Sequence, residues 1–293
     1  MPIHRFILHN QDIRDASEPV FTAGQAGLLS GWGVFSTVRV VEGVLFAFER
    51  HWARMMRDAR LLNVEMPGDC GAVIRSVQKL IEANQAPNCT LRIAVSRNAG
   101  NGWEGAPIGR ASDVVALTAD LKNWGTGVNL TVQEKGRYSD GEFSGAKILA
   151  WAQNLTWAER AKQKGFDEVI LLNERDEVAE CTSANIFIAK GPQIFTPPLF
   201  SGCLAGITRE LLLTEVRIPG VEVVEDTITR SGLALADEIF ITSTTRDLLP
   251  VLTIDGVKVK NTGQVRGPLN AAFRRYLDGY VGERKLGVQT ASL

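Results

Sequence analysis

The sequence predicts a mixed α/β protein of the α+β type, and three features of its residue pattern support that class. Short β-rich runs are joined by tight turns, as over 34–48, where Glu42-Gly43 separates two strand-like segments. Apolar residues recur at helical spacing between groups of strands. The regular strand–helix alternation of a doubly wound parallel sheet is absent from the pattern.

The first half of the chain is expected to contain one hairpin, two helices and further strands. Apolar side chains spaced three and four residues apart predict one helix over 49–62 and another over 72–83. Alternation of apolar and polar residues marks the strands. The strands are expected at 6–8, 34–41, 44–48, 91–96 and 114–118.

A change of pattern around 123–127, where two glycines follow Asn123-Trp124, predicts a domain boundary. We therefore expect a smaller N-terminal α/β domain over 1–122 and a larger domain over 127–293, which suits a chain of 293 residues. The elements expected after the boundary are strands at 128–132, 168–173, 177–181, 185–189, 194–196, 221–224 and 238–242, helices over 148–164, from 206 and over 265–280, and a hairpin near 255–256.

The composition excludes several classes of function. Lys and Arg number 32 against 33 Asp and Glu, so the chain lacks the basic surplus of a nucleic-acid-binding domain. No apolar run approaches the roughly 20 residues of a membrane helix, and the first residues lack a signal-peptide pattern. We expect a cytoplasmic protein without nucleic-acid or membrane partners.

Metal and dinucleotide sites are also not expected. The four cysteines and three histidines have no metal-ligand spacing, so the cysteines are predicted to be free thiols and no metal site is predicted. A literal G-x-G-x-x-G occurs at Gly100, Gly102 and Gly105. Because another strand rather than a helix follows it, we interpret it as a glycine-rich loop.

Short motifs along the second half carry the strongest functional signal. Lys147 stands among small residues in Ser144-Gly145-Ala146-Lys147, and Glu180 ends a strand within 178–187. Further on, 204–209 opens a helix, and 238–245 precedes Leu-Pro-Val at 249–251. This ordered set, with the stretch that begins at Gly31, resembles the class IV (fold type IV) pyridoxal-phosphate (PLP) enzymes. That family includes branched-chain and D-amino-acid aminotransferases and aminodeoxychorismate lyase.

The resemblance implies PLP as the cofactor and assigns two residues to its reactive end. Lys147 matches the lysine whose amine forms a Schiff base with the cofactor and shuttles the Cα proton. Glu180 matches the acid beside the pyridinium nitrogen, which must stay protonated to stabilise a carbanion. Taken alone, Lys147 would be interpreted as an ordinary surface lysine and Glu180 as an ordinary strand-end acid; the ordered motifs around them change that interpretation.

The resemblance also assigns a phosphate site and a substrate site. A helix N-terminus supplies N–H donors and partial positive charge for a phosphate, although a threonine there is equally suited to capping the helix. The residues matched to phosphate binding are Gly206, Ile207, Thr208, Ser243, Thr244 and Arg54. The residues matched to substrate binding are Arg39, Arg92 and Thr245.

The implied reaction is transfer of an amino group between an amino acid, branched-chain-like in type, and a 2-oxo acid. Branched-chain enzymes commonly place a tyrosine five residues after the lysine, whereas Ala152 stands here. The alternative is therefore an aminodeoxychorismate lyase that releases pyruvate and 4-aminobenzoate. A non-catalytic PLP carrier or interaction protein is a third hypothesis, and the presence of both Lys147 and Glu180 argues against it.

The resemblance further implies architecture and assembly. Fold type IV enzymes have a smaller and a larger domain with the cofactor in the cleft, a location where binding sites are common. Members of the family are homodimers or larger, so we expect a homodimer. L or D preference is not readable from these residues.

Overall fold

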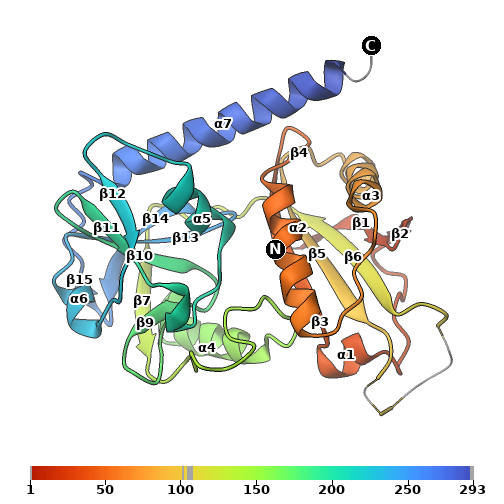
Figure 1. The fold of residues 1–293 in the computed structure, drawn as a ribbon, viewed down its shortest axis with the longest axis horizontal. Coiled ribbons are helices and arrows are strands. Elements are labelled where there is room, and N and C mark those ends of the chain that lie inside the picture. The colour runs from red at the N-terminus through yellow and green to blue at the C-terminus, as the bar shows by residue number, and fades with distance from the viewer. Residues whose placement is uncertain (1, 101, 104–107, 291–293) are drawn as a thin grey trace. The chain divides into compact units, whose positions relative to one another are not determined.

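The computed structural model describes residues 2–100, 102–103 and 108–290, the last four by their backbone alone, and the chain divides into two compact units (Figure 1). The first unit consists of Met1–Lys122, Lys147–Trp151 and Tyr280–Leu293. The second consists of Asn123–Ala146 and Ala152–Gly279. The short Lys147–Trp151 segment thus belongs to the first unit, although the chain on both sides of it belongs to the second.

The first unit is built on an antiparallel six-stranded sheet with the order β2-β1-β6-β5-β3-β4. Its strands are β1 (Ile3–His9), β2 (Asp12–Asp15), β3 (Gly33–Val41), β4 (Val44–Leu45), β5 (Cys89–Arg97) and β6 (Ser112–Ala119). Its helices are α1 (Ala26–Ser30), α2 (Phe48–Leu61) and α3 (Cys70–Ala83). The predicted hairpin and both predicted helices are confirmed.

Alternation along β3 separates the core of this unit from its opposite sheet face. Val34, Val38 and Val40 are buried in one cluster with apolar residues of α2 and α3. Because side chains alternate along a strand, Phe35 and Arg39 point to the other face. One face of the sheet is therefore committed to packing, and the other carries an aromatic and a cationic side chain.

One polar contact is buried within the packed layer. Ser36 of β3 and His51 of α2 are both buried, and the Ser36 Oγ lies 2.7 Å from the His51 Nδ1. Burial, with smaller contributions from the charges of Arg54 and Lys147, lowers the pKa of His51 well below 6.5. His51 is therefore neutral in the folded protein at neutral pH.

The second unit is built on a mixed sheet with the order β12-β11-β10-β13-β14-β7-β8-β9, and β15 pairs with β14. Its strands are β7 (Val128–Gln133), β8 (Glu168–Leu172), β9 (Val178–Cys181), β10 (Asn185–Lys190), β11 (Gln193–Thr196), β12 (Glu222–Glu225), β13 (Glu238–Ser243), β14 (Asp247–Ile254) and β15 (Val257–Lys258). Its helical elements are α4 (Ala152–Gln163), η1 (Leu199–Ser201), α5 (Ile207–Thr214), α6 (Arg230–Ala234) and the first part of α7 (Arg266–Thr290).

The β10–β13 pair forms the centre of this unit. Ile186 and Ile241 are opposite each other in the register and lie in the main apolar cluster. On the other face of the same strands, the rings of Phe187 and Phe240 stack with centroids 5.1 Å apart. Apolar side chains thus cover both faces, which explains why these strands read as nearly continuous apolar runs.

Two predicted helices have different bounds in the structure. The helix expected over 148–164 begins only at Ala152, because Ile148 instead pairs with Val34 of β3. The helix expected over 265–280 continues to Thr290. There the Tyr280 hydroxyl donates to Glu49 Oε2 at 2.7 Å, and its ring packs against Phe46.

Further observations complete the fold. The four cysteines are free, as predicted. Gly100 and Gly102 lie in a loop, whereas Gly105 falls outside the residues that the structure describes. Among the described helices, none combines the length and the apolar character needed to cross a membrane.

The neutral, buried His51 should make the protein less stable in mild acid. Its pKa is lowered in the folded state, so below about pH 6.5 the unfolded chain binds a proton that the folded chain excludes. We expect the unfolding free energy to fall by up to about 1.4 kcal/mol per pH unit below that point. In His51→Asn, whose side chain does not titrate in this range, this component should disappear. Urea unfolding of the wild type and the variant at pH 7.5, 6.5 and 5.5 measures the unfolding free energy of each. The same loss of unfolding free energy with falling pH in both proteins would contradict the prediction.

Candidate active site

The backbone of the Lys147 segment is bonded to β3 around an isolated antiparallel bridge between Ile148 and Val34. The Lys147 N–H donates to Asp58 Oδ2 at 3.0 Å, and its carbonyl accepts from Phe35 N at 3.1 Å. Two residues later, Leu149 N donates to Gly33 O at 2.9 Å. Both backbone groups of Lys147 are therefore bonded, which leaves its side chain as the part that can act on a ligand.

Two glycines at the start of β3 make this close approach possible. Gly31 has φ of +60°, a conformation that favours glycine, and a Cβ on it would lie 3.0 Å from the Ala150 backbone. A Cβ on Gly33 would collide with Val95 O and lie 2.5 Å from Leu149 Cδ1. Gly31 and Gly33 thus leave space for the Lys147 segment, and Gly33 also leaves space for the backbone of β5.

The Lys147 amine and the Arg92 guanidinium share one aromatic surface. Lys147 Nζ lies 4.4 Å from the centroid of the Phe35 ring, and Arg92 Cζ lies 3.9 Å from it. The Trp151 ring meets Phe35 edge-on at 5.7 Å and lies 5.5 Å from Lys147 Nζ. Burial lowers the pKa of Arg92. The two cations and two rings form a surface that suits an anionic ligand with an apolar body.

Helix α2 contributes polar groups along one side. Arg54 is buried, and its Nη2 donates to Ser36 Oγ at 2.9 Å, the oxygen that also contacts His51. Asp58, one turn further along α2, holds the Lys147 N–H. This helix therefore positions a buried arginine and the Lys147 backbone together.

In the second unit, Glu180 is a buried carboxylate with a donor on each oxygen. Arg137 Nη2 lies 2.6 Å from Glu180 Oε1, and the Leu204 N–H donates to Oε2 at 3.0 Å. Burial raises the pKa of Cys181, the next residue, and raises the pKa of Cys203 to about 12. Both thiols are therefore neutral at neutral pH.

The start of α5 has no side-chain cap, because Gly206 occupies the position before the first helical residue. The N–H groups at a helix start suit an anion. A Cβ on Gly206 would collide with Asn185 Oδ1. The Asn185 amide in turn donates to Leu204 O at 2.9 Å. Leu204 thereby links this helix start to Glu180, and Thr208 is buried in the first turn.

The turn after β13 is fixed by a buried arginine. Arg246 N donates to Ser243 O at 3.2 Å, so Ser243 and Thr244 lie in a tight turn. The Arg246 guanidinium pairs with Glu168 at 3.1 Å and donates to Ser183 O at 2.8 Å. The turns that follow β9 and β13 are therefore tied to each other.

The predicted site residues fall into two groups. Lys147, Arg54, Arg39 and Arg92 lie in the first unit. Because Arg92 is opposite Thr37 in the register, it shares a sheet face with Phe35 and Arg39. The residues in the second unit are Glu180, Gly206, Ile207, Thr208, Ser243, Thr244 and Thr245.

The structure adds residues that the sequence pattern did not identify. These are Arg137, Asn185, Arg246, His51 and Asp58. Arg137, Asn185 and Asp58 contact segments that lie far from them along the chain, whereas His51 and Arg246 lie three residues from Arg54 and Ser243. Arg137 and Glu180 are 43 residues apart, so only the folded chain identifies the pair that they form.

The donor set fits PLP. Lys147 supplies an amine with its backbone fixed, Glu180 supplies a buried carboxylate, and Gly206 supplies a helix start that a side chain would obstruct. An amine can react with the aldehyde of PLP, a carboxylate can bind its pyridine nitrogen, and a helix start can bind its phosphate.

Comparison with known proteins gives a consistent result. The family model described as amino-transferase class IV matches residues 33–254. A protein of Methanocaldococcus jannaschii named "Putative branched-chain-amino-acid aminotransferase" is 31% identical over 268 residues, covering 90% of this chain and 92% of the relative. The D-alanine aminotransferase of Bacillus licheniformis is 28% identical and covers 85% and 88%.

A solved structure supports the fold. The branched-chain amino acid aminotransferase of Escherichia coli has a TM-score of 0.86 at 23% identity and covers 94% of this chain and 96% of its own. The predicted α+β class and fold type IV are thereby confirmed. The comparisons favour an aminotransferase over the alternative lyase. The chain belongs to the class IV aminotransferases, which are PLP-dependent enzymes.

Proposed function

We propose that this aminotransferase moves the amino group of a branched-chain-like amino acid to a 2-oxo acid, with Lys147 as the residue that binds PLP covalently. The observation that carries the proposal is the lysine itself: its N–H and C=O are both bonded, and its Nζ lies over Phe35. When bound, PLP supplies an electron sink for the charge left on Cα after the proton departs. Lys147 Nζ moves that proton.

The other residues bind and orient the cofactor. Glu180 holds the ring nitrogen in its protonated form, because its carboxylate is buried and already oriented by two donors. The first-turn N–H groups of Ile207 and Thr208 after Gly206 bind the phosphate. Ser243 and Thr244 supply further donors, and Arg54 supplies positive charge.

The substrate is bound by groups near Lys147. The described contacts of the Arg92 guanidinium are with the Phe35 and Trp151 rings, so its N–H donors suit the substrate carboxylate. Arg39 shares that sheet face, and Thr245 follows the Ser243 turn; we assign both to substrate binding. The rings beside Lys147 favour an apolar side chain on the substrate. Homodimerisation remains a prediction from the family resemblance, and a cytoplasmic location remains a prediction from the sequence pattern.

Loss of the Lys147 amine should remove both cofactor attachment and catalysis. The wild-type protein with PLP should have an absorption band near the visible edge that disappears on borohydride reduction. Lys147→Ala should lack the band and lose about 10³-fold or more in rate, because attachment and proton transfer are both lost. Lys164 is an exposed lysine 17 residues further along the chain, so Lys164→Ala is the matched control. It should keep both the absorption band and the activity. A colourless wild-type protein that binds no added PLP would refute the cofactor role.

Substrate preference should follow the size of the apolar side chain. With 2-oxoglutarate as acceptor, we expect leucine, isoleucine or valine to react about tenfold or more faster than alanine, since each buried methylene is worth about 1–3 kcal/mol. Initial rates over both enantiomers of each amino acid measure this. D-alanine as the best donor, or pyruvate release from aminodeoxychorismate without an acceptor, would overturn the assignment.

Removal of the Arg92 charge should weaken substrate binding specifically. Arg92→Gln should raise KM for the amino acid and the 2-oxo acid about 10- to 100-fold, the size expected for losing hydrogen bonds from a charged donor. PLP binding should not change. Arg5→Gln is the matched control, because Arg5 also lies over a ring, that of Phe6, but is exposed and paired with Asp15. Steady-state kinetics measure both KM values, and an unchanged KM in Arg92→Gln would exclude Arg92 from the substrate site.

A further inference from the structure

The two donors to Glu180 come from segments without helix or strand. Arg137 lies in the loop after β7, and Leu204 lies in the loop after η1. Each donor has one anchor of its own: the Arg137 N–H donates to Leu172 O at 3.1 Å, and the Leu204 carbonyl accepts from Asn185. One neighbouring turn supplies a further side-chain contact to each of the two segments.

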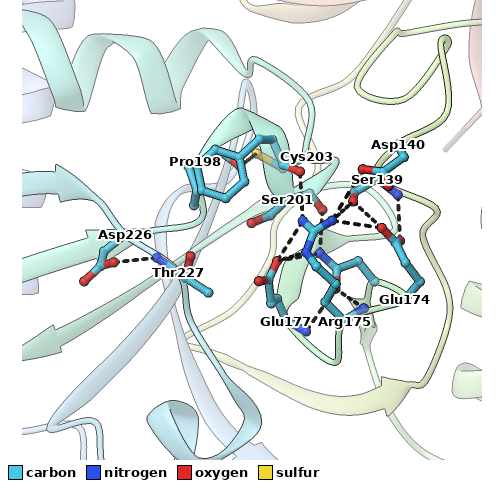
Figure 2. Close-up of polar contacts among 12 residues, drawn as sticks. Ser139, Asp140, Glu174, Arg175, Glu177, Pro198, Ser201, Cys203, Asp226 and Thr227 are labelled. Atoms are coloured by element: carbon cyan, nitrogen blue, oxygen red, sulfur yellow. Dashed lines mark hydrogen bonds and ion pairs between the residues drawn. The ribbon is translucent and has the colours of Figure 1, made fainter.

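Arg175, in the turn between β8 and β9, joins the two loops (Figure 2). Its Nη1 donates to Ser139 Oγ at 2.7 Å, two residues after Arg137. Its Nη2 donates to the carbonyl of Phe200 at 3.1 Å, four residues before Leu204. The rigid fork of one guanidinium thus spans the segments that carry both donors.

The turn that carries Arg175 is itself fixed. Asn173 Oδ1 accepts from the backbone N–H of Arg175 at 2.9 Å and of Glu177 at 3.0 Å. The Glu177 carboxylate accepts from Arg175 Nη2 at 2.9 Å, and Glu174 accepts from Ser139 N at 2.8 Å (Figure 2). Contacts within its own turn therefore orient the guanidinium toward the two loops.

The two loops also touch each other at a glycine. Gly202 has φ of +91°, and a Cβ on it would lie 2.9 Å from Arg137 Cγ and 3.0 Å from Ser139 Cα. A shift of either loop would therefore be transmitted to the other. Since the side chain of Arg175 is 37% exposed, its ion pairs add little to global stability. Its effect is on the geometry of the loops.

We propose that Arg175 is a positioning residue that holds Arg137 and the Leu204 N–H on the two carboxylate oxygens of Glu180. The inference rests on the proposed function, in which Glu180 binds the ring nitrogen of PLP. In this role Arg175 contacts neither the cofactor nor the substrate. It acts through the two loops, so its loss should weaken the interaction between Glu180 and the cofactor.

The test measures PLP affinity of the apoenzyme as well as steady-state kinetics. Arg175→Ala should weaken PLP binding about tenfold, the usual cost of losing one second-layer support of a ligand, and lower kcat while KM for the amino acid stays unchanged. The melting temperature of the apoenzyme should change by no more than about 3 °C. Arg175→Lys keeps the charge but lacks the fork, so its PLP affinity should stay below that of the wild type.

A double-mutant cycle with Glu180→Gln separates positioning from general destabilisation. In the Glu180→Gln background, Arg175→Ala should cause no further loss of PLP affinity or kcat, because its effect passes through the same carboxylate. Arg230→Ala is the matched control: Arg230 is an exposed arginine of the same unit that pairs with Glu134 and Asp255, and its loss should change neither quantity.

The outcomes distinguish the two proposals. Additive losses in the cycle, full rescue by Arg175→Lys, or an Arg175→Ala variant that behaves like Arg230→Ala would overturn the positioning role. If Glu180→Gln alone leaves PLP affinity and kcat unchanged, the role proposed for Glu180 fails instead.

Discussion

The backbone pairing between the Lys147 segment and the start of β3 is the constraint on which the first unit's chemistry depends. Both peptide groups of Lys147 are bonded, one to Asp58 and one to Phe35. A lysine side chain loses considerable conformational entropy when it is ordered, and a fixed backbone reduces what remains to be ordered. The glycines at 31 and 33 follow from this pairing, because a Cβ at either position would meet the Lys147 segment.

In the second unit, hydrogen bonds fix a carboxylate in the same way. Glu180 is buried, and a buried charge is costly unless its oxygens are bonded. Arg137 and the Leu204 N–H meet that need, and Leu204 is also tied through Asn185 to the start of α5. One chain of contacts therefore joins the group that suits a ring nitrogen to the helix start that suits a phosphate.

The sequence predicted much of the fold because periodicity reports burial. Most of the predicted strands and helices appear within a few residues of the expected positions, since apolar alternation and helical spacing are local properties. The short elements β2, α1 and α6 and most of β14 were not predicted. Two helix bounds differ where distant contacts override local preference. Helix α4 begins at Ala152 because Ile148 pairs with β3, and α7 extends past Tyr280 because that residue packs against Phe46.

By itself, the sequence determined the fold class and the family and singled out Lys147 and Glu180 as candidate site residues, because these depend on residue types in a fixed order along the chain. Only the tertiary structure decided which side chains support them. Arg137, Asp58 and Arg175 are ordinary polar residues in the sequence, and each gains its role from a partner in a distant segment. Hydrogen bonds act over about 3 Å, so these partnerships exist only after the chain has folded.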